Sequence, residues 1–97
     1  KLHKENYRAE LGYMLNKHFH GKGIMLEATA AVIHYGFEIM KLHSIEALIN
    51  PENHKSAKIL ERSGFRKEAH FKENFFHNGV FEDTVIYGLL KAEYKKR

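Results

Sequence analysis

Apolar residues recur at three- and four-residue spacing in two parts of the chain, which is the pattern of amphipathic helices. The first helix is expected over residues 26–41, about four turns, and the second over 53–63. Gly64 follows the second helix at the position where a left-handed cap is typical. Gly36 lies inside the first helix and lowers its helix propensity by about 1 kcal/mol relative to alanine, so packing must stabilise that turn.

Four other segments have the alternating or strand-like character of a β-sheet. They are residues 9–15, 45–49, 65–76 and 80–90. Asn50-Pro51 ends the second segment, and Asn78-Gly79, between the last two, is the strongest hairpin signal in the chain. Residues 1–7 are polar and are expected to form a loop, and residues 91–97 form a basic end.

The predicted elements follow the order strand, helix, strand, helix, strand, strand. The first two strands are joined through a helix, so we expect them to be parallel with a right-handed crossover, and the last two to be an antiparallel hairpin. The fold class is therefore α/β, with a mixed parallel and antiparallel sheet and flanking helices in a single domain over residues 1–97. The hydrophobic fraction of 43% and the aromatic fraction of 12% exclude a disordered chain.

Charge and cysteine usage narrow the class of partner. The net charge is +4 with the eight histidines neutral, which suits a small acidic ligand better than a nucleic-acid track. No apolar run approaches the roughly 18 residues of a membrane span, so we expect no membrane partner. The chain has no cysteine, which excludes a disulfide framework and a thiolate zinc site and fits a cytoplasmic location.

The loop from His20 to Met25 lies between a predicted strand and the longer helix, and it contains Gly21 and Gly23. Glycines let the backbone approach a ligand closely, and the N–H groups that begin a helix attract anions. With Lys22 as an additional cation, a pyrophosphate is the expected ligand; the alternative is that the glycines only turn the chain. The loop is neither a P-loop nor the dinucleotide-binding fingerprint, because it lacks the residues that complete those motifs.

Several motifs occur together in this chain in the order and at the spacing of one known family. They are Ala9-Glu10-Leu11-Gly12-Tyr13, Gly21-Lys22-Gly23-Ile24 with Glu27-Ala28, Asn50-Pro51-Glu52-Asn53 with Ser56, Leu60-Glu61-Arg62-Ser63-Gly64-Phe65-Arg66-Lys67-Glu68, and Asn78-Gly79 followed by Asp83 and Tyr87. On these motifs the chain resembles the GCN5-related N-acetyltransferases (GNAT), specifically the RimJ/RimL branch of ribosomal-protein N-terminal acetyltransferases. The likeness runs from about Ala9 to Leu90 and implies the C-terminal part of an acyl-CoA N-acyltransferase fold.

The resemblance implies that acetyl-coenzyme A (acetyl-CoA) binds as a co-substrate where strands 9–15 and 45–49 separate. The loop residues that would hold its pyrophosphate are His20, Gly21, Lys22, Gly23, Ile24 and Met25. The pantetheine arm would follow the first strand near Met14 and Leu15, where a backbone N–H would polarise the thioester carbonyl. No metal is implied.

The resemblance also implies roles for individual side chains. Asn53 would hydrogen-bond the pantetheine, Lys58 would contact a coenzyme phosphate, and Ser56 would protonate the departing thiolate. The general base stays open, because related enzymes often place a glutamate within residues 16–18 and this chain does not. Glu10 or His18 is the candidate base, directly or through water, unless the amine arrives already neutral.

Each of these residues has a structural alternative. Asn53 would serve equally as a helix N-cap, and Ser56 as an ordinary polar position of the same helix. Glu10 would be an outward strand residue, and Lys58 and Arg62 would belong to a solvated helix face. His18 and His20 have a spacing that strands use to bind metal, but the loop offers no Asp, Glu or Cys beside them.

Two positions of the loop depart from the family pattern. His20 stands where Gln or Arg is usual, and Met25 stands where Gly or Ala is usual, which narrows the approach to the loop amides. Five phenylalanines are expected to pack in the core and sheet or to line an acceptor site: Phe65, Phe71, Phe75, Phe76 and Phe81.

The leading prediction is an N-acetyltransferase that moves an acetyl group from acetyl-CoA to a primary amine, with a ribosomal-protein N-terminus as the candidate acceptor. A non-catalytic acyl-CoA-binding fragment without an acceptor site is the alternative. Net charge and aromatic residues are the only support for a nucleic-acid binder, so none is expected. In the family fold, strand 9–15 pairs with an antiparallel strand that precedes it, and no such strand is expected in these residues. We therefore expect its free edge to pair with another copy of the chain or to leave the fold poorly stable.

Overall fold

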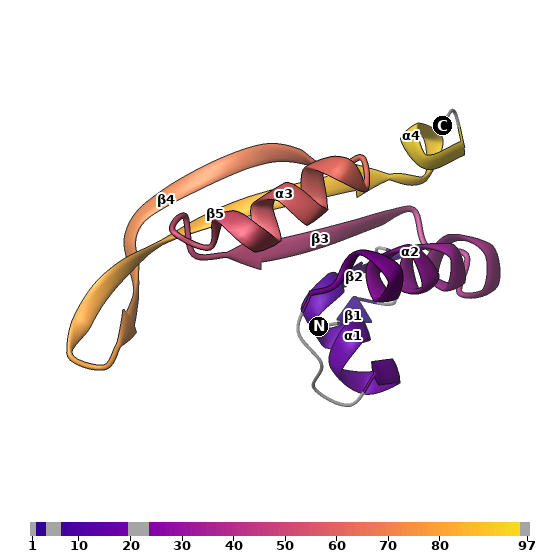
Figure 1. Ribbon diagram of the computed structural model, residues 1–97. Coiled ribbons are helices and arrows are strands. Elements are labelled where there is room, and N and C mark those ends of the chain that lie inside the picture. Colours follow the sequence, from indigo (N-terminus) through magenta and orange to yellow (C-terminus); the bar gives the residue numbers. More distant parts are fainter. Residues whose placement is uncertain (1, 4–6, 20–23, 96–97) are drawn as a thin grey trace.

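The structure, a computed structural model, describes residues 2–3, 7–19 and 24–95, with side chains described over 7–15 and 24–95. It contains a five-stranded sheet with strand order β1-β2-β3-β5-β4 (Figure 1). The strands are β1 (Leu2–His3), β2 (Arg8–Glu10), β3 (Ser44–Ile49), β4 (Arg66–His77) and β5 (Val80–Leu90). The parallel β2–β3 pair and the antiparallel β4–β5 hairpin confirm the predicted mixed sheet.

The predicted strand over residues 9–15 is wrong beyond Glu10, because helix α1 (Leu11–Phe19) begins there. Leu11, Met14 and Leu15 are buried, whereas Gly12 and Tyr13 are exposed. Burial at positions i, i+3 and i+4 is the period of a helix, and it packs one side of α1 against the core.

The prediction of a loop over residues 1–7 is wrong at β1. This short strand pairs antiparallel with β2, placing Leu2 opposite Ala9 and His3 opposite Arg8. β2 therefore has a neighbour on each side, which corrects the expectation of an unpaired edge at this strand. The proposed pairing of that edge with another copy of the chain loses its structural basis.

The predicted helix over residues 26–41 is present as α2 (Leu26–His34) continued by a π-helical turn, η2 (Tyr35–Ile39). Gly36 lies in η2, and a Cβ atom there would be 3.0 Å from Met14 Cε and 3.1 Å from Ile45 Cδ1. The close approach of α1 and β3 to this glycine is the packing that stabilises a turn with low helix propensity.

The core lies between one face of the sheet and the helices. Ile45 and Ala47 of β3 are buried on that face, opposite Leu89 and Tyr87 of β5. Helix α3 (His54–Arg62) confirms the second predicted helix and covers the same face, because Glu61 contacts the Tyr87 hydroxyl. The pKa of Tyr87 is raised mainly by burial of the hydroxyl and, to a smaller extent, by the nearby Glu61 carboxylate.

The β4–β5 hairpin extends beyond the end of β3, as Figure 1 shows at the orange end of the sheet. Asn78 and Gly79 have positive φ values of 50° and 79°, which confirms the predicted turn. Near the middle of the hairpin, Asp83 Oδ2 is 2.8 Å from His70 Nε2, and Asp83 Oδ1 accepts the backbone N–H of Glu73 at 2.8 Å. These two bonds cross-link a part of β4 where its pairing with β5 is irregular.

The chain ends in helix α4 (Lys91–Lys95), where the sequence predicted only a basic end. Tyr94 of α4 packs its ring 5.1 Å from the ring of Phe37 in η2. This contact joins the C-terminal segment to the core.

Candidate functional site

The start of α2 is the described part of the predicted anion-binding loop. His20, Gly21, Lys22 and Gly23 lie outside the described residues. Met25 is the N-cap of α2 in an extended conformation (φ −129°, ψ 146°), and its side chain makes no capping hydrogen bond. Side-chain capping from Met25 therefore does not occupy the first-turn amides of α2, and this end of the helix favours an anion.

Other predicted binding residues in the first half of the chain have core roles. Ile24 packs partly buried against the core, and the side chains of Met14 and Leu15 are inside it. The backbone groups of Met14 and Leu15 belong to helix α1, not to an open strand edge. We expected pantetheine to hydrogen-bond to Met14 and Leu15 as an added strand would. This expectation is wrong, because the backbone of both residues is helical.

Asn53 and Ser56 meet at the start of α3. Asn53 Oδ1 accepts the backbone N–H of Ser56 at 3.2 Å, which confirms the structural role of Asn53 as an N-cap. Ser56 lies in the first turn of the helix and is buried, with 8% of the residue exposed. Lys58 is exposed on the same helix.

Glu10 does not join Ser56. Glu10 is the last residue of β2 and lies opposite Glu46 in the parallel register with β3. The residue before it, Ala9, is buried on the core face. Because side chains alternate along a strand, Glu10 projects from the sheet face opposite α3, which carries Ser56. Glu10 and Ser56 therefore lie on opposite faces of the sheet, and the role of Glu10 as a base toward the amine stays a prediction.

A cavity of about 290 Å³ lies between α2, α3 and α4. It is lined by Leu26, Ala30, Ile33, Arg62, Ser63 and Tyr94. Ser63 Oγ is buried and has no hydrogen-bond partner within the part of the chain that the structure describes. An apolar groove with one unsatisfied hydroxyl and a guanidinium is suited to a ligand with both a hydrocarbon arm and an anionic group.

Sequence reasoning missed Arg62 and Ser63 as candidate ligand contacts. Arg62 follows Lys58 by four residues, and this spacing places both cations on one side of α3. That spacing was the available signal for a basic stripe, whereas only the packing of α2 beside α3 reveals the groove.

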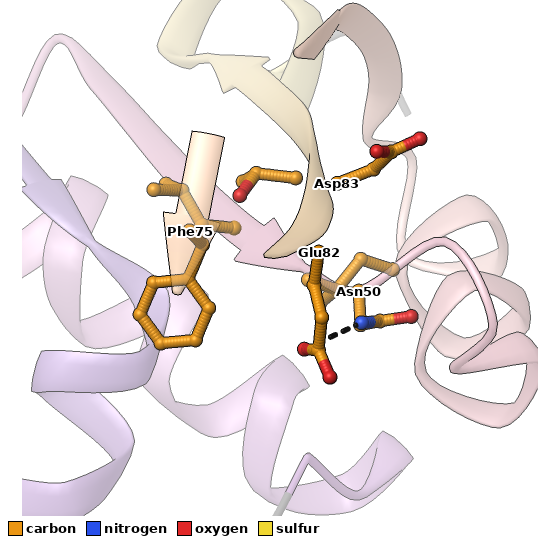
Figure 2. Close-up of a pocket in the computed structure, with 7 residues that line it drawn as sticks. Asn50, Phe75, Glu82 and Asp83 are labelled. Atoms are coloured by element: carbon orange, nitrogen blue, oxygen red, sulfur yellow. Dashed lines mark hydrogen bonds between the residues drawn. The ribbon is translucent and has the colours of Figure 1, made fainter. Parts of the chain in front are cut away.

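A second cavity, of about 230 Å³, lies where β3 ends beside the hairpin. Its lining is Leu48, Ile49, Asn50, Phe75, Glu82, Asp83 and Thr84. Figure 2 shows the Glu82 carboxylate next to the Asn50 amide, with Phe75 across from them and Asp83 directed away. Asn50 Nδ2 donates to Glu82 Oε1 at 3.1 Å.

Among the described residues, no group of three His, Cys, Asp or Glu side chains is arranged to hold a metal ion. The His18-x-His20 pair lies outside this statement, because the side chain of the first and the whole of the second are not described. No helix in the described part of the chain combines the length and apolar character needed to span a membrane.

The mixed sheet, in which α1 and α2 connect the parallel strands β2 and β3 and α3 follows β3, has the architecture of an acyl-CoA N-acyltransferase fold. Comparison with known families agrees: the acetyltransferase (GNAT) domain matches residues 1–66, and the chain belongs to this family.

Individual relatives support the same assignment. The chain is 44% identical over 85 residues to a probable N-acetyltransferase, YjcK, of Bacillus subtilis, covering 88% of this chain and 47% of the relative. It is 34% identical over 84 residues to the ribosomal protein uS5-alanine N-acetyltransferase of Escherichia coli, covering 87% and 43%. Among solved structures, a mutant spermidine/spermine N-acetyltransferase, SpeG, from Vibrio cholerae matches with a TM-score of 0.72 and 34% identity, covering 79% and 46%. The chain thus spans about half the length of these relatives.

Proposed function

We propose that this chain binds acetyl-CoA and transfers the acetyl group to a primary amine by direct attack in a ternary complex. The observation that carries the proposal is the buried Ser56 in the first turn of α3, where its backbone N–H donates to Asn53 Oδ1 and fixes the turn that carries the hydroxyl. A hydroxyl at the positive end of a helix dipole is a suitable proton donor to a departing thiolate, because its own alkoxide is stabilised there.

The residues of the α2–α3 groove fit the coenzyme. The first-turn amides of α2, preceded by the loop from His20 to Met25, suit the pyrophosphate. Arg62 and Lys58 suit a phosphate group, and the unsatisfied Ser63 Oγ suits a polar group of the ligand. Asn53 uses its Oδ1 atom for the cap, so its Nδ2 group is the part that would donate to pantetheine.

In the proposed reaction, the neutral amine nitrogen attacks the thioester carbonyl carbon, and a C–N bond forms as the C–S bond breaks. Ser56 gives its hydroxyl proton to the thiolate sulfur, and the proton lost by the amine returns to Ser56 through water. The amine arrives neutral or loses its proton to a base, directly or through water. Glu10 stays a proposed base, because it projects from the face of the sheet that carries Glu46 and Leu48. His18 stays a predicted alternative base.

The acceptor belongs to the same proposal. Relatives named for a ribosomal-protein alanine and for spermidine or spermine support a primary amine as the acceptor class. A ribosomal-protein N-terminus is the first candidate, on the resemblance to the RimJ/RimL branch. We further propose a cytoplasmic location.

The test combines coenzyme binding with turnover. Calorimetry with acetyl-CoA measures binding, and thiol release with alanine-starting peptides and with spermidine measures transfer. Ser56→Ala is expected to lower kcat by about 100-fold or more at unchanged coenzyme affinity, the usual range for a general acid. Ser44→Ala makes the same chemical change in β3 and is the control.

A non-catalytic acyl-CoA-binding module is the second candidate, because the groove between α2, α3 and α4 suits the coenzyme whether or not an amine also binds. Coenzyme binding without thiol release from any amine would establish that function instead. Absence of coenzyme binding would exclude both. Equal kcat for the wild type and Ser56→Ala across pH would remove Ser56 from the reaction.

A further inference from the structure

The cavity at the end of β3 combines an apolar wall with one oriented carboxylate. Leu48 is 47% exposed and Phe75 is 52% exposed, so about half of each residue remains open to a ligand even though the Phe75 ring stacks on His77 at 5.8 Å. Leu48 pairs with Ile86 on β5, and strand alternation places Thr84 and Glu82 on the same face of the sheet. The side chains of Leu48 and Phe75 and the carboxylate of Glu82 therefore line the same cavity.

Asn50 fixes the orientation of the Glu82 carboxylate. Its Oδ1 atom accepts the backbone N–H of Glu52 at 2.8 Å, which leaves Nδ2 to donate to Glu82 Oε1 at 3.1 Å. Glu82 Oε2 has no hydrogen bond or ion pair with any residue that the structure describes. One carboxylate oxygen is thus held and the other remains available to a ligand.

The neighbouring carboxylate is already committed to the hairpin. Both oxygens of Asp83 are bonded, one to His70 and the other to the backbone of Glu73. These bonds hold the pKa of Asp83 below its usual range, mainly through the Glu73 N–H and then through His70. The cavity therefore offers a ligand one free carboxylate oxygen, Glu82 Oε2, in a partly buried position where a charged hydrogen bond is stronger than in water.

We propose that this cavity binds a primary alkylammonium group, with the ammonium on Glu82 and its aliphatic chain against Leu48 and Phe75. A volume of about 230 Å³ is smaller than drug-sized pockets and suits the end of an aminoalkyl chain. This inference rests on the proposed transfer to an amine, and it favours an aminoalkyl acceptor over the peptide N-terminus that the resemblance alone suggests. The turn after Asn50 leads directly into the Asn53 cap, because the N–H of Asn53 donates to the Asn50 carbonyl at 2.9 Å.

The test measures amine binding without any transfer reaction. The full chain is titrated with n-butylammonium, with the neutral isostere n-butanol and with alaninamide, and backbone amide NMR shifts are followed at Asn50, Phe75 and Glu82. We expect n-butylammonium to bind more tightly than the other two. Glu82→Gln keeps an acceptor for Asn50 but loses the charge, so it should weaken n-butylammonium binding at least tenfold.

Glu73→Gln is the matched control, because it makes the same change on the same hairpin outside the cavity lining and should leave binding unchanged. Equal affinity of the wild type and Glu82→Gln overturns the proposal, as does equal binding of n-butanol or tighter binding of alaninamide. The affinity of Glu82→Gln for acetyl-CoA distinguishes a failure of the amine site from a failure of the proposed transferase function. Unchanged coenzyme affinity with lost amine binding supports the acceptor site, whereas amine binding in a chain that binds no coenzyme refutes only the transferase function.

Discussion

Asn53 allows the cap of α3 to be separated from its proposed contact with the coenzyme. In the structure its Oδ1 atom accepts the Ser56 N–H at 3.2 Å, while the proposed ligand contact uses Nδ2. Asn53→Ala removes both groups. Asn53→Asp keeps an acceptor for the cap, adds a favourable negative charge at a helix start, and removes the donor.

The size of the stability effect follows from the cap. Loss of an N-cap costs about 0.5–2 kcal/mol, and the long bond of the exposed Asn53 places it in the lower half of that range, at about 0.5–1 kcal/mol. For a domain of this size, that loss corresponds to a decrease in Tm of about 2–8 °C. Urea and thermal unfolding should therefore show Asn53→Ala below the wild type and Asn53→Asp at or above it.

Coenzyme binding should separate the same variants in a different order. Calorimetry with acetyl-CoA is expected to show a loss of about fivefold for both Asn53→Ala and Asn53→Asp, the size of one hydrogen bond. If Asn53→Asp binds the coenzyme as the wild type does, Asn53 is only a cap. If Asn53→Ala and Asn53→Asp are equally stable, the geometry of the cap does not determine the stability of α3.

Two further predictions concern α1 and the hairpin. Gly12 is exposed in α1, and an added Cβ would meet no atom within 4 Å outside its own turn of helix, so Gly12→Ala should raise the free energy of unfolding by about 0.5–1 kcal/mol, measured in urea; an unchanged or lower free energy of unfolding would contradict this reasoning. The folded pKa of Asp83 is lowered by the Glu73 N–H and by His70, so its stabilisation is present above the unfolded pKa and is lost as the pH falls through the folded value. Protection factors of the hairpin amides, which correct the exchange rate for its intrinsic pH dependence, should therefore fall below pH about 4 in the wild type and lose this dependence in Asp83→Asn; wild-type protection factors that do not change with pH would contradict the argument.

The elements that the sequence predicted correctly carry strong local signals. The helix over 53–63 has an N-cap and a glycine after its end, and the turn at Asn78-Gly79 has the residues that positive φ requires. The segment over 9–15 has no such signal. Its apolar residues Leu11, Met14 and Leu15 fit a helix period, but over so few positions a loose alternation fits as well. Packing against η2 and β3 decides between the two.

The site was harder to predict than the fold because its contacts join distant parts of the chain. Asn53 and Ser56 are three residues apart, so their relation was visible as a helix cap. Asn50 and Glu82 are separated by 32 residues, and no local sequence pattern predicts that their side chains meet. Ser63 gives no signal at all in the sequence, because its unsatisfied hydroxyl becomes apparent only once α2 packs beside it.

The two cavities lie on opposite faces of the sheet, and β3 connects them. The groove of Arg62 and Ser63 belongs to the face covered by α2 and α3, whereas Leu48 and Glu82 face the other side. In the proposed reaction, the coenzyme would therefore reach Ser56 along the face covered by α2 and α3, whereas the amine would approach from the other face, and neither would block the other. Such separate access predicts a ternary complex formed in either order, and it explains how one short turn after Asn50 can link amine binding to the proton donor at Ser56.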